Sequence, residues 1–330
     1  MKGDYEMKKV SLFYTYYTRG LIDSQSNSIH KLKLAAVNLL KCYLMRPNDY
    51  IMRLYLLCLI KLGLDDTYKN FCEERAAQGY VGAYSTCGIF FANNPKYYDE
   101  QQSLYYFDRG MKANDAKSFH DLANLYYLGS KAFDKDLEKA ETIALKGLAL
   151  NDPHFNGPIC YLLGRINLDK KTYKFAFNYF NKALEYGYRK ACYYLALMYR
   201  DGLEVDENLD KYMDYLLMDL NVDSAIELGG VFASGEIVPM DNFVAFNYFD
   251  YAAKQGNPMG ALMCAGLISD GQLYNEKKVD KYLEIAFRSE KGEQLIKDSF
   301  DELEKALGEK ASKLLREKAE KYWATSKIFA

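Results

Sequence analysis

Apolar and polar residues follow one arrangement that recurs about eight times along this chain. Its clearest copy begins at Leu195: a small residue follows directly, an aromatic residue stands four positions on, and a glycine stands seven positions on. The residues that match Leu195, which we call anchors, are Phe13, Leu56, Cys87, Leu122, Leu163, Leu195, Leu228 and Cys264. Successive anchors lie 31 to 43 residues apart, a period typical of stacked helical repeats. We therefore predict an array of small units rather than one or two globular domains.

The positions around each anchor predict a first helix in every unit. The residue after the anchor is small in most copies, which lets a second helix approach closely: Tyr14, Leu57, Gly88, Ala123, Gly164, Ala196, Gly229 and Ala265. A bulky residue follows one helical turn after the anchor, on the same face: Tyr17, Ile60, Phe91, Tyr126, Asn167, Tyr199, Phe232 and Ile268. The helix is predicted to stop in a left-handed conformation seven residues after the anchor, at Gly20, Gly63, Asn94, Gly129, Lys170, Gly202, Gly235 and Gly271.

A second amphipathic helix follows each first helix after a loop of variable length. Its predicted starting positions are Ala36, Tyr68, Ser103, Ala140, Ala176, Tyr212, Ala245 and Val279. Proline disrupts a helix interior, and all six prolines avoid the predicted helix cores. They fall between units, inside loops, or at the start of a first helix: Pro47, Pro95, Pro153, Pro158, Pro239 and Pro258. The proline positions therefore agree with the predicted helix pairs.

The stretch from Ala191 to Gly256 resembles Sel1-like repeats, which are relatives of the tetratricopeptide repeat. Its first helix reads Leu-Ala-Leu-Met-Tyr-Arg-Asp-Gly, and its second reads Ala-Phe-Asn-Tyr-Phe-Asp-Tyr-Ala-Ala-Lys-Gln-Gly. The resemblance covers roughly residues 8 to 290 and implies an all-α fold: a right-handed α-solenoid of about eight antiparallel helix pairs. The tetratricopeptide repeat is the near alternative, but its period is nearly fixed at about 34 residues.

The domain organisation follows from where the repeat pattern ends. Residues 1–290 are predicted to form the repeat array. In residues 291–330 the pattern changes to charged helices with narrow apolar stripes, followed by a tail. A terminal element with one polar face protects the last unit of an array from aggregation, so these helices are predicted to cap it. A role in binding a partner helix is the alternative.

Composition and cysteine usage suggest a cytoplasmic protein. The first nine residues lack the apolar core of a signal peptide, and no apolar run approaches the ~20 residues of a membrane span. Export by a non-classical bacterial route stays open. The seven cysteines are odd in number and form no Cys-x-x-Cys pair, so neither a zinc site nor a disulfide framework is expected. Four of them occupy predicted core positions: Cys87, Cys160, Cys192 and Cys264.

Candidate chemistry is scarce, which favours a binding protein over an enzyme. Three histidines stand far apart, and the chain has no Gly-rich phosphate loop and no nucleophile elbow. We therefore expect no catalytic residue, metal or cofactor. A helical repeat protein that reads RNA is a less favoured alternative, because a net charge of −2 lacks the basic character of that class.

The resemblance implies that first helices line the concave wall of the array. The exposed side of each first helix then lies two and five residues before and after its anchor. In the three central units these positions hold four cations, three tyrosines and no carboxylate. The candidate partner-binding residues are Lys117, His120, Asn124, Tyr127, Tyr161, Arg165, Lys190, Tyr193 and Arg200.

Such a surface is suited to an acidic or carboxylate-ended peptide. The alternative explanation is that long cations simply cover apolar surface. The sequence therefore predicts a non-catalytic adaptor or scaffold that binds a protein or peptide partner in this groove. A regulatory subunit or a host-interacting bacterial effector is the alternative function.

Overall fold

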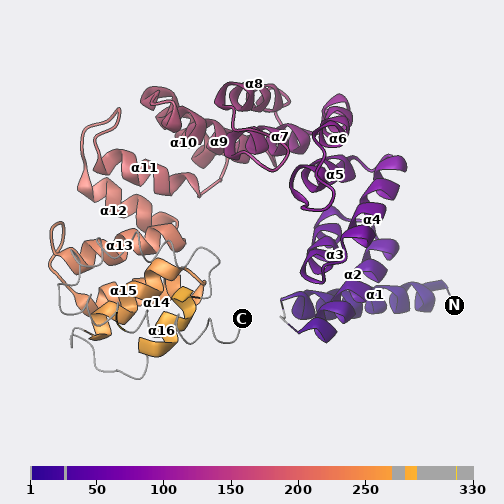
Figure 1. Ribbon diagram of the computed structural model, residues 1–330, viewed down its shortest axis with the longest axis horizontal. Coiled ribbons are helices and arrows are strands. Elements are labelled where there is room, and N and C mark those ends of the chain that lie inside the picture. Colours follow the sequence, from indigo (N-terminus) through magenta and orange to yellow (C-terminus); the bar gives the residue numbers. More distant parts are fainter. Residues whose placement is uncertain (1, 26–27, 270–278, 288–316, 318–330) are drawn as a thin grey trace. The chain divides into compact units, whose positions relative to one another are not determined.

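The computed structural model describes residues 2–25, 28–269, 279–287 and 317, and all the regular elements in these ranges are α-helices (Figure 1). The helices are α1 (Lys2–Ser24), α2 (Ile29–Met45), α3 (Asp49–Lys61), α4 (Asp65–Ala77), α5 (Val81–Asn93), α6 (Glu100–Lys112), α7 (Ala116–Leu128), α8 (Leu137–Leu148), α9 (Asn156–Asp169), α10 (Tyr173–Glu185), α11 (Ala191–Arg200), α12 (Leu209–Met218), α13 (Val222–Ser234), α14 (Asn242–Lys254), α15 (Pro258–Ser269) and α16 (Val279–Phe287). The chain divides into two compact units, Met1–Ile166 and Asn167–Ala330.

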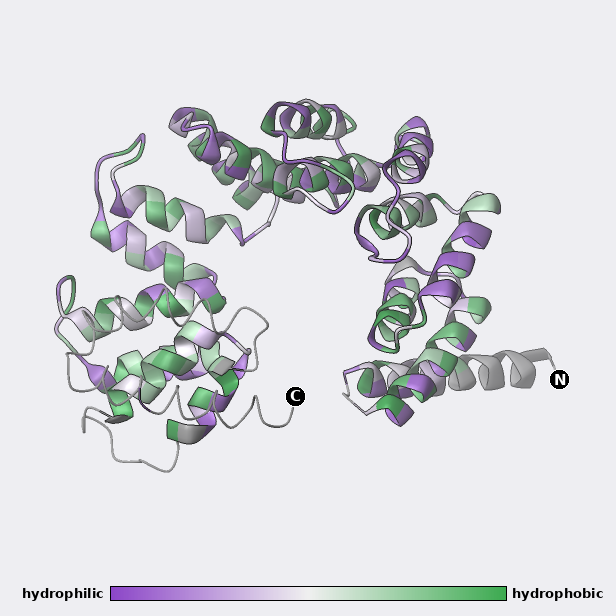
Figure 2. Cartoon of the chain, viewed as in Figure 1, coloured by the Kyte–Doolittle hydropathy of each residue, from purple (hydrophilic) through white to green (hydrophobic). Residues whose placement is uncertain are grey.

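Consecutive helices pack as hairpins within each unit. In the first unit α1 packs on α2, α3 on α4, α5 on α6 and α7 on α8. In the second unit α11 packs on α12, α13 on α14 and α15 on α16. The division between the units falls within α9, and α10 follows it in the second unit. Single helices carry both hydrophobic and hydrophilic segments (Figure 2), as expected when one face is buried. The prediction of an all-α array of helix pairs is confirmed.

The small residue after the anchor marks the point where paired helices approach most closely. A Cβ atom on Gly88 would lie 2.6 Å from the ring of Phe107, and one on Gly229 would lie 2.4 Å from the ring of Phe249. Real Cβ atoms essentially never approach another heavy atom that closely. The alanines at this position in three further repeats are completely buried: Ala123, Ala196 and Ala265. The predicted role of this position is therefore confirmed in these five repeats.

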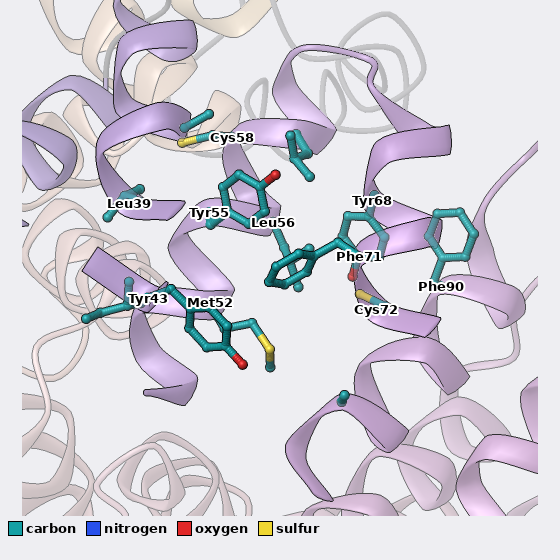
Figure 3. Packing of buried hydrophobic residues seen from close by; sticks show 14 of the residues in the cluster. Leu39, Tyr43, Met52, Tyr55, Leu56, Cys58, Tyr68, Phe71, Cys72 and Phe90 are labelled. Atoms are coloured by element: carbon teal, nitrogen blue, oxygen red, sulfur yellow. The ribbon is translucent and has the colours of Figure 1, made fainter. Parts of the chain in front are cut away.

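The register predicted for α3 is wrong by one residue. Leu57 and Ile60, assigned to the packing face, are 42% and 58% exposed, whereas Tyr55 and Leu59 are 5% and 2% exposed. Tyr55 is therefore the true anchor, and its ring packs edge-on against Phe71 with the centroids 5.0 Å apart (Figure 3). The register was predicted wrongly because α3 carries apolar residues on several sides. Its periodicity therefore does not identify a single buried stripe.

Gly20 does not end its helix, contrary to prediction. It lies inside α1, which continues to Ser24, and a Cβ atom on it would lie 2.8 Å from the Cγ atom of Leu39 in α2. Gly20 is therefore the small packing residue of the first repeat, equivalent to Gly88 in the third. Phe13, the predicted anchor, is partly buried and packs against the same core.

The predicted left-handed stops hold for four glycines, which all have positive φ: Gly63, Gly129, Gly202 and Gly235. Asn94 is instead extended, with φ −67° and ψ 126°. After α9 the positive φ falls on Lys171, at 58°, rather than on the predicted Lys170. Gly271 lies outside the described residues.

The predicted starting residues of the second helices are all buried, but most of these helices begin earlier. Six helices start three residues before the predicted position. In four of them, the residue directly before the helix is a capping side chain that sequence reasoning overlooked: Asp99, Asp136, Asn208 and Asp241. At α8 the Asp136 carboxylate accepts a hydrogen bond of 2.9 Å from the backbone N–H of Lys139. These caps satisfy backbone donors at the helix N-terminus that would otherwise lack partners.

Replacing Asp136 by alanine should lower the free energy of unfolding by about 1 kcal/mol, because the cap hydrogen bond and the favourable charge at the N-terminus of α8 are both lost. Asp134, an exposed loop carboxylate two residues earlier, provides the matched control. Its replacement by alanine should change stability by less than about 0.5 kcal/mol. Urea denaturation followed by circular dichroism measures both, and equal losses would contradict the capping role.

Three further sequence predictions concern cysteines, prolines and the C-terminal region. All seven cysteines are buried and free, including the four that were predicted to occupy core positions. Pro158 lies in the first turn of α9, Pro258 is the first residue of α15, and the other prolines lie in loops. The predicted capping helices in 291–330 lie outside the described residues, apart from Glu317.

No helix within the described ranges has both the length and the apolar character needed to cross a membrane.

Candidate interaction surface

We use the term first-helix face for the surface that the first helices present opposite their anchors. In the first unit, α7 supplies most of the candidate residues. Its N-terminus is fixed by Asp115, whose carboxylate accepts a hydrogen bond of 3.1 Å from the backbone N–H of Ser118. Lys117, His120 and Asn124 then follow along α7 and are all partly buried. The helix therefore holds these three side chains in one row on the first-helix face.

Lys117 is part of a nearly buried ion pair with Asp121. Its ammonium lies 2.9 Å from the carboxylate, and the two side chains are only 12% and 14% exposed. The ammonium also donates to the hydroxyl of Ser85 in α5. The second carboxylate oxygen of Asp121 lies 2.9 Å from Nδ1 of His120. Lys117 therefore presents little unopposed charge to a ligand.

Asp121 keeps its negative charge despite its burial. Burial works to raise the pKa of this carboxyl, but the hydrogen bond with His120 and the positive charge of Lys117 outweigh it and lower the pKa. Asp121 stands one residue before the anchor, a position that the sequence analysis did not count as part of the exposed face. The structure thus places a carboxylate among cations that the sequence pattern suggested were unopposed.

Arg165 of α9 lies against two tyrosines in the first unit. Its guanidinium carbon is 4.7 Å from the ring centroid of Tyr127 and 5.6 Å from that of Tyr161. Both distances are within the range of cation–π attraction. Tyr127 is only 6% exposed, so it is a buried support for Arg165 and not the exposed contact residue that was predicted. Tyr161 and Arg165 are partly exposed and share the surface.

The remaining three candidates lie on α11, or directly before it, in the second unit. Arg200 forms ion pairs of 3.0 Å with Glu227 and 2.7 Å with Asp201. The hydrogen bond with Asp201 and the charge of Glu227 raise the pKa of Arg200. Burial, together with the charge of Glu227, raises the pKa of the partly buried Tyr193 to about 12. Lys190, at the start of α11, is exposed.

The nine candidate residues are therefore divided between the units, six in the first and three in the second. In each unit the structure adds a carboxylate one residue before an anchor, Asp121 in the first and Glu227 in the second, and each pairs with a candidate cation. The positive charge predicted for Lys117 and Arg200 is thus largely compensated.

A pocket on the first-helix face of the first unit was missed by sequence reasoning. It has a volume of about 350 Å³, and its walls come from three successive first helices and one second helix. The lining residues are Arg53, Leu56, Leu57 and Ile60 of α3, Tyr68 of α4, Thr86 and Ile89 of α5, and Lys117 and Asp121 of α7. The error of one residue in the register of α3 hid it, because that error assigned Leu57 and Ile60 to the packing face.

A larger hollow of about 660 Å³ lies beside the loop between α11 and α12 in the second unit. Its wall includes the acidic side chains Glu204 and Asp206, and Lys211, whose ammonium lies 4.6 Å from the ring centroid of Tyr199. Throughout the described part of the chain, no group of three or more histidine, cysteine or acidic residues could hold a metal ion. Five of its seven lining residues lie in that loop, among them the polar Glu204, Asp206 and Asn208.

The chain was compared with protein families, with curated proteins and with solved structures. No family model and no curated protein matches it. A Sel1 repeat protein from Oxalobacter formigenes is similar in structure, with a TM-score of 0.56 over 77% of this chain and 97% of that protein, at 19% sequence identity. This chain has the Sel1-like repeat fold. The resemblance predicted from the sequence is thus confirmed at the level of the fold.

A second Sel1-like structure is similar over more of the chain but less closely. It is a protective antigen present in uropathogenic Escherichia coli strains, with a TM-score of 0.48 and 17% identity. The similarity covers 85% of this chain and 66% of that protein. At these identities the Sel1-like similarity describes how the helices are arranged, and the partner has to be inferred from the side chains of this chain.

Proposed function

We propose that this Sel1-like repeat protein is a non-catalytic adaptor that binds a protein or peptide on its first-helix face. The observation that carries the proposal is the cluster of Arg165, Tyr127 and Tyr161, where a guanidinium is held over aromatic rings at the protein surface. Arginine and tyrosine are enriched among the residues that dominate binding energy at protein interfaces. Helical repeat arrays use such extended surfaces for binding.

The proposed partner contributes an acidic or carboxylate-ended segment. Lys117 and Arg200 are already engaged with Asp121 and Glu227, so we expect them mainly to shape the surface. The attraction for an acidic ligand then comes chiefly from the exposed Lys190. Arg165 and its two tyrosines supply a contact surface beside it. Seven free cysteines favour a reducing compartment, such as the cytoplasm, as the place of binding.

Affinity capture from a lysate of the native organism tests the proposal. Wild-type protein is compared with Arg165→Gln, Lys190→Glu and, as a control on the exposed side of α8, Lys146→Glu. A specific partner should be recovered at about tenfold lower yield with either first-helix variant and at unchanged yield with Lys146→Glu. Circular dichroism melting confirms that each variant is folded. Equal recovery with all four proteins would contradict binding at the first-helix face.

A further inference from the structure

The pocket between α3, α5 and α7 exposes apolar side chains that no described residue covers. Leu57 and Ile60 on its rim are 42% and 58% exposed. With Tyr55 as anchor, both stand on the side of α3 that faces away from the core. Two tyrosines further along the first helices are also more than half exposed: Tyr14 at 58% and Tyr50 at 53%. Apolar surface of this kind gains free energy when a ligand removes it from water.

The wall of the pocket is preformed by the hydrophobic core. Leu56, Tyr68 and Thr86 line it and are 3%, 7% and 8% exposed. The Tyr68 ring is stacked on Phe90 with their centroids 4.8 Å apart, and the hydroxyl of Thr86 donates to the carbonyl oxygen of Gly82. These contacts hold the wall in place without a ligand. The volume of about 350 Å³ lies at the lower end of the range of ~300–1,000 Å³ usual for ligand pockets.

The charged residues of the pocket favour an acidic neighbour beside the apolar group. Its lining contains Arg53 (+1), Lys117 (+1) and Asp121 (−1), which sum to +1. Lys117 and Asp121 neutralise each other at 2.9 Å. Arg53 is exposed and makes no ion pair or hydrogen bond within the described part of the chain. The uncompensated positive charge therefore lies at the rim, next to Leu57 and Ile60.

We infer that this pocket anchors a peptide segment of a partner protein in which a large apolar residue stands beside an aspartate or glutamate. The apolar side chain enters the pocket against Leu56, Leu57 and Ile60, and the carboxylate pairs with the guanidinium of Arg53. This inference rests on the proposed function and adds to it an anchor site and a sequence preference. The acidic preference follows from Arg53, and the apolar preference follows from the exposed leucine and isoleucine.

A peptide selection tests the inference without knowledge of the natural partner. A phage-displayed library of random 12-residue peptides is selected on the immobilised full chain, and one enriched peptide is synthesised with a fluorophore. Enriched sequences should carry Leu, Ile, Met or Phe within two residues of Asp or Glu. Fluorescence anisotropy should then give a dissociation constant at least about tenfold weaker for Leu57→Ser and for Arg53→Glu. Exchanging the peptide's acidic residue for lysine should restore binding to Arg53→Glu.

Two variants on the exposed side of α2 serve as matched controls. Leu44→Ser removes a leucine that is 60% exposed, and Lys33→Glu reverses the charge of another exposed cation. Both should bind the peptide as the wild type does. Peptides that weaken with Arg165→Gln but not with Leu57→Ser would overturn the pocket while supporting the proposed function. A selection without enrichment, or peptides indifferent to both sets of variants, would overturn both.

Self-association is the competing explanation for the apolar rim. Sedimentation velocity at micromolar concentration should give a monomer for the wild type and for Leu57→Ser. A wild-type dimer that Leu57→Ser dissociates would assign the pocket to a second copy of this chain and overturn the inference.

Discussion

Replacing Gly229 by alanine should lower the free energy of unfolding of the second unit by about 3 kcal/mol, the upper part of the range for an overpacked core. The added methyl group would lie 2.4 Å from Cε1 of Phe249. Phe249 is 1% exposed, so its ring cannot turn out into solvent, and we expect α13 and α14 to separate. Urea denaturation of the full chain, followed by circular dichroism, measures the loss.

Gly230, the next residue of α13, is a closely matched control. A Cβ atom there has no heavy atom within 4 Å. Gly230→Ala should therefore stabilise the protein by up to about 1 kcal/mol, since alanine favours a helix interior over glycine. In addition, Phe249→Leu should partly relieve the effect of Gly229→Ala, because the two residues are in direct contact. Similar effects of the two glycine substitutions would refute the close approach of α13 and α14.

Replacing Asp121 by alanine should destabilise the first unit by about 3 kcal/mol, because removing one member of a buried ion pair leaves the other charge without compensation. Lys117, with a side chain only 12% exposed, would lose its carboxylate partner. The exposed pair of Lys112 and Asp108 in α6 provides the control, since those side chains are 74% and 51% exposed. Asp108→Ala should cost less than about 1 kcal/mol.

The pH dependence of stability gives this prediction an independent check. The folded pKa of Asp121 is lowered relative to the unfolded chain, so its charge contributes stability that is present above the unfolded pKa of about 3.9. That contribution is lost as the pH falls through the folded pKa. The difference in unfolding free energy between wild type and Asp121→Asn should therefore shrink only below about pH 4. A difference that stays constant down to pH 3 would show that the ion pair contributes nothing.

The fold was predictable because its packing residues repeat. Small residues recur wherever paired helices approach, and a chemical requirement seen in several units can be recognised without a structure. The predicted helix register was wrong where the packing position could not be told apart from its neighbours. In α3, apolar residues occupy both the packed and the exposed positions, and in α1 the packing glycine, Gly20, stands where a helix stop was also plausible.

The binding surface was only partly predictable, because its charge depends on ion pairs with carboxylates that the repeat pattern does not contain. Asp121 and Glu227 stand one residue before their anchors, on the border between the buried and exposed sides of the helix. Other repeats have uncharged residues at this position, such as Thr86 and Leu162, so the repeat pattern does not predict a carboxylate there. The pocket beside Leu57 depended on the register of α3 and could not be found until that register was known.

Site-specific photocrosslinking tests most directly whether the first-helix face binds a partner. A photoreactive phenylalanine analogue replaces Asn124 or Lys190 on that face, or Lys146 or Lys182 on the exposed side of the second helices α8 and α10. After irradiation in a native lysate, the first two positions should form a covalent adduct with a discrete protein, and the last two should not. Adducts formed only from Lys146 or Lys182 would contradict the account, because they would place the partner on the second helices.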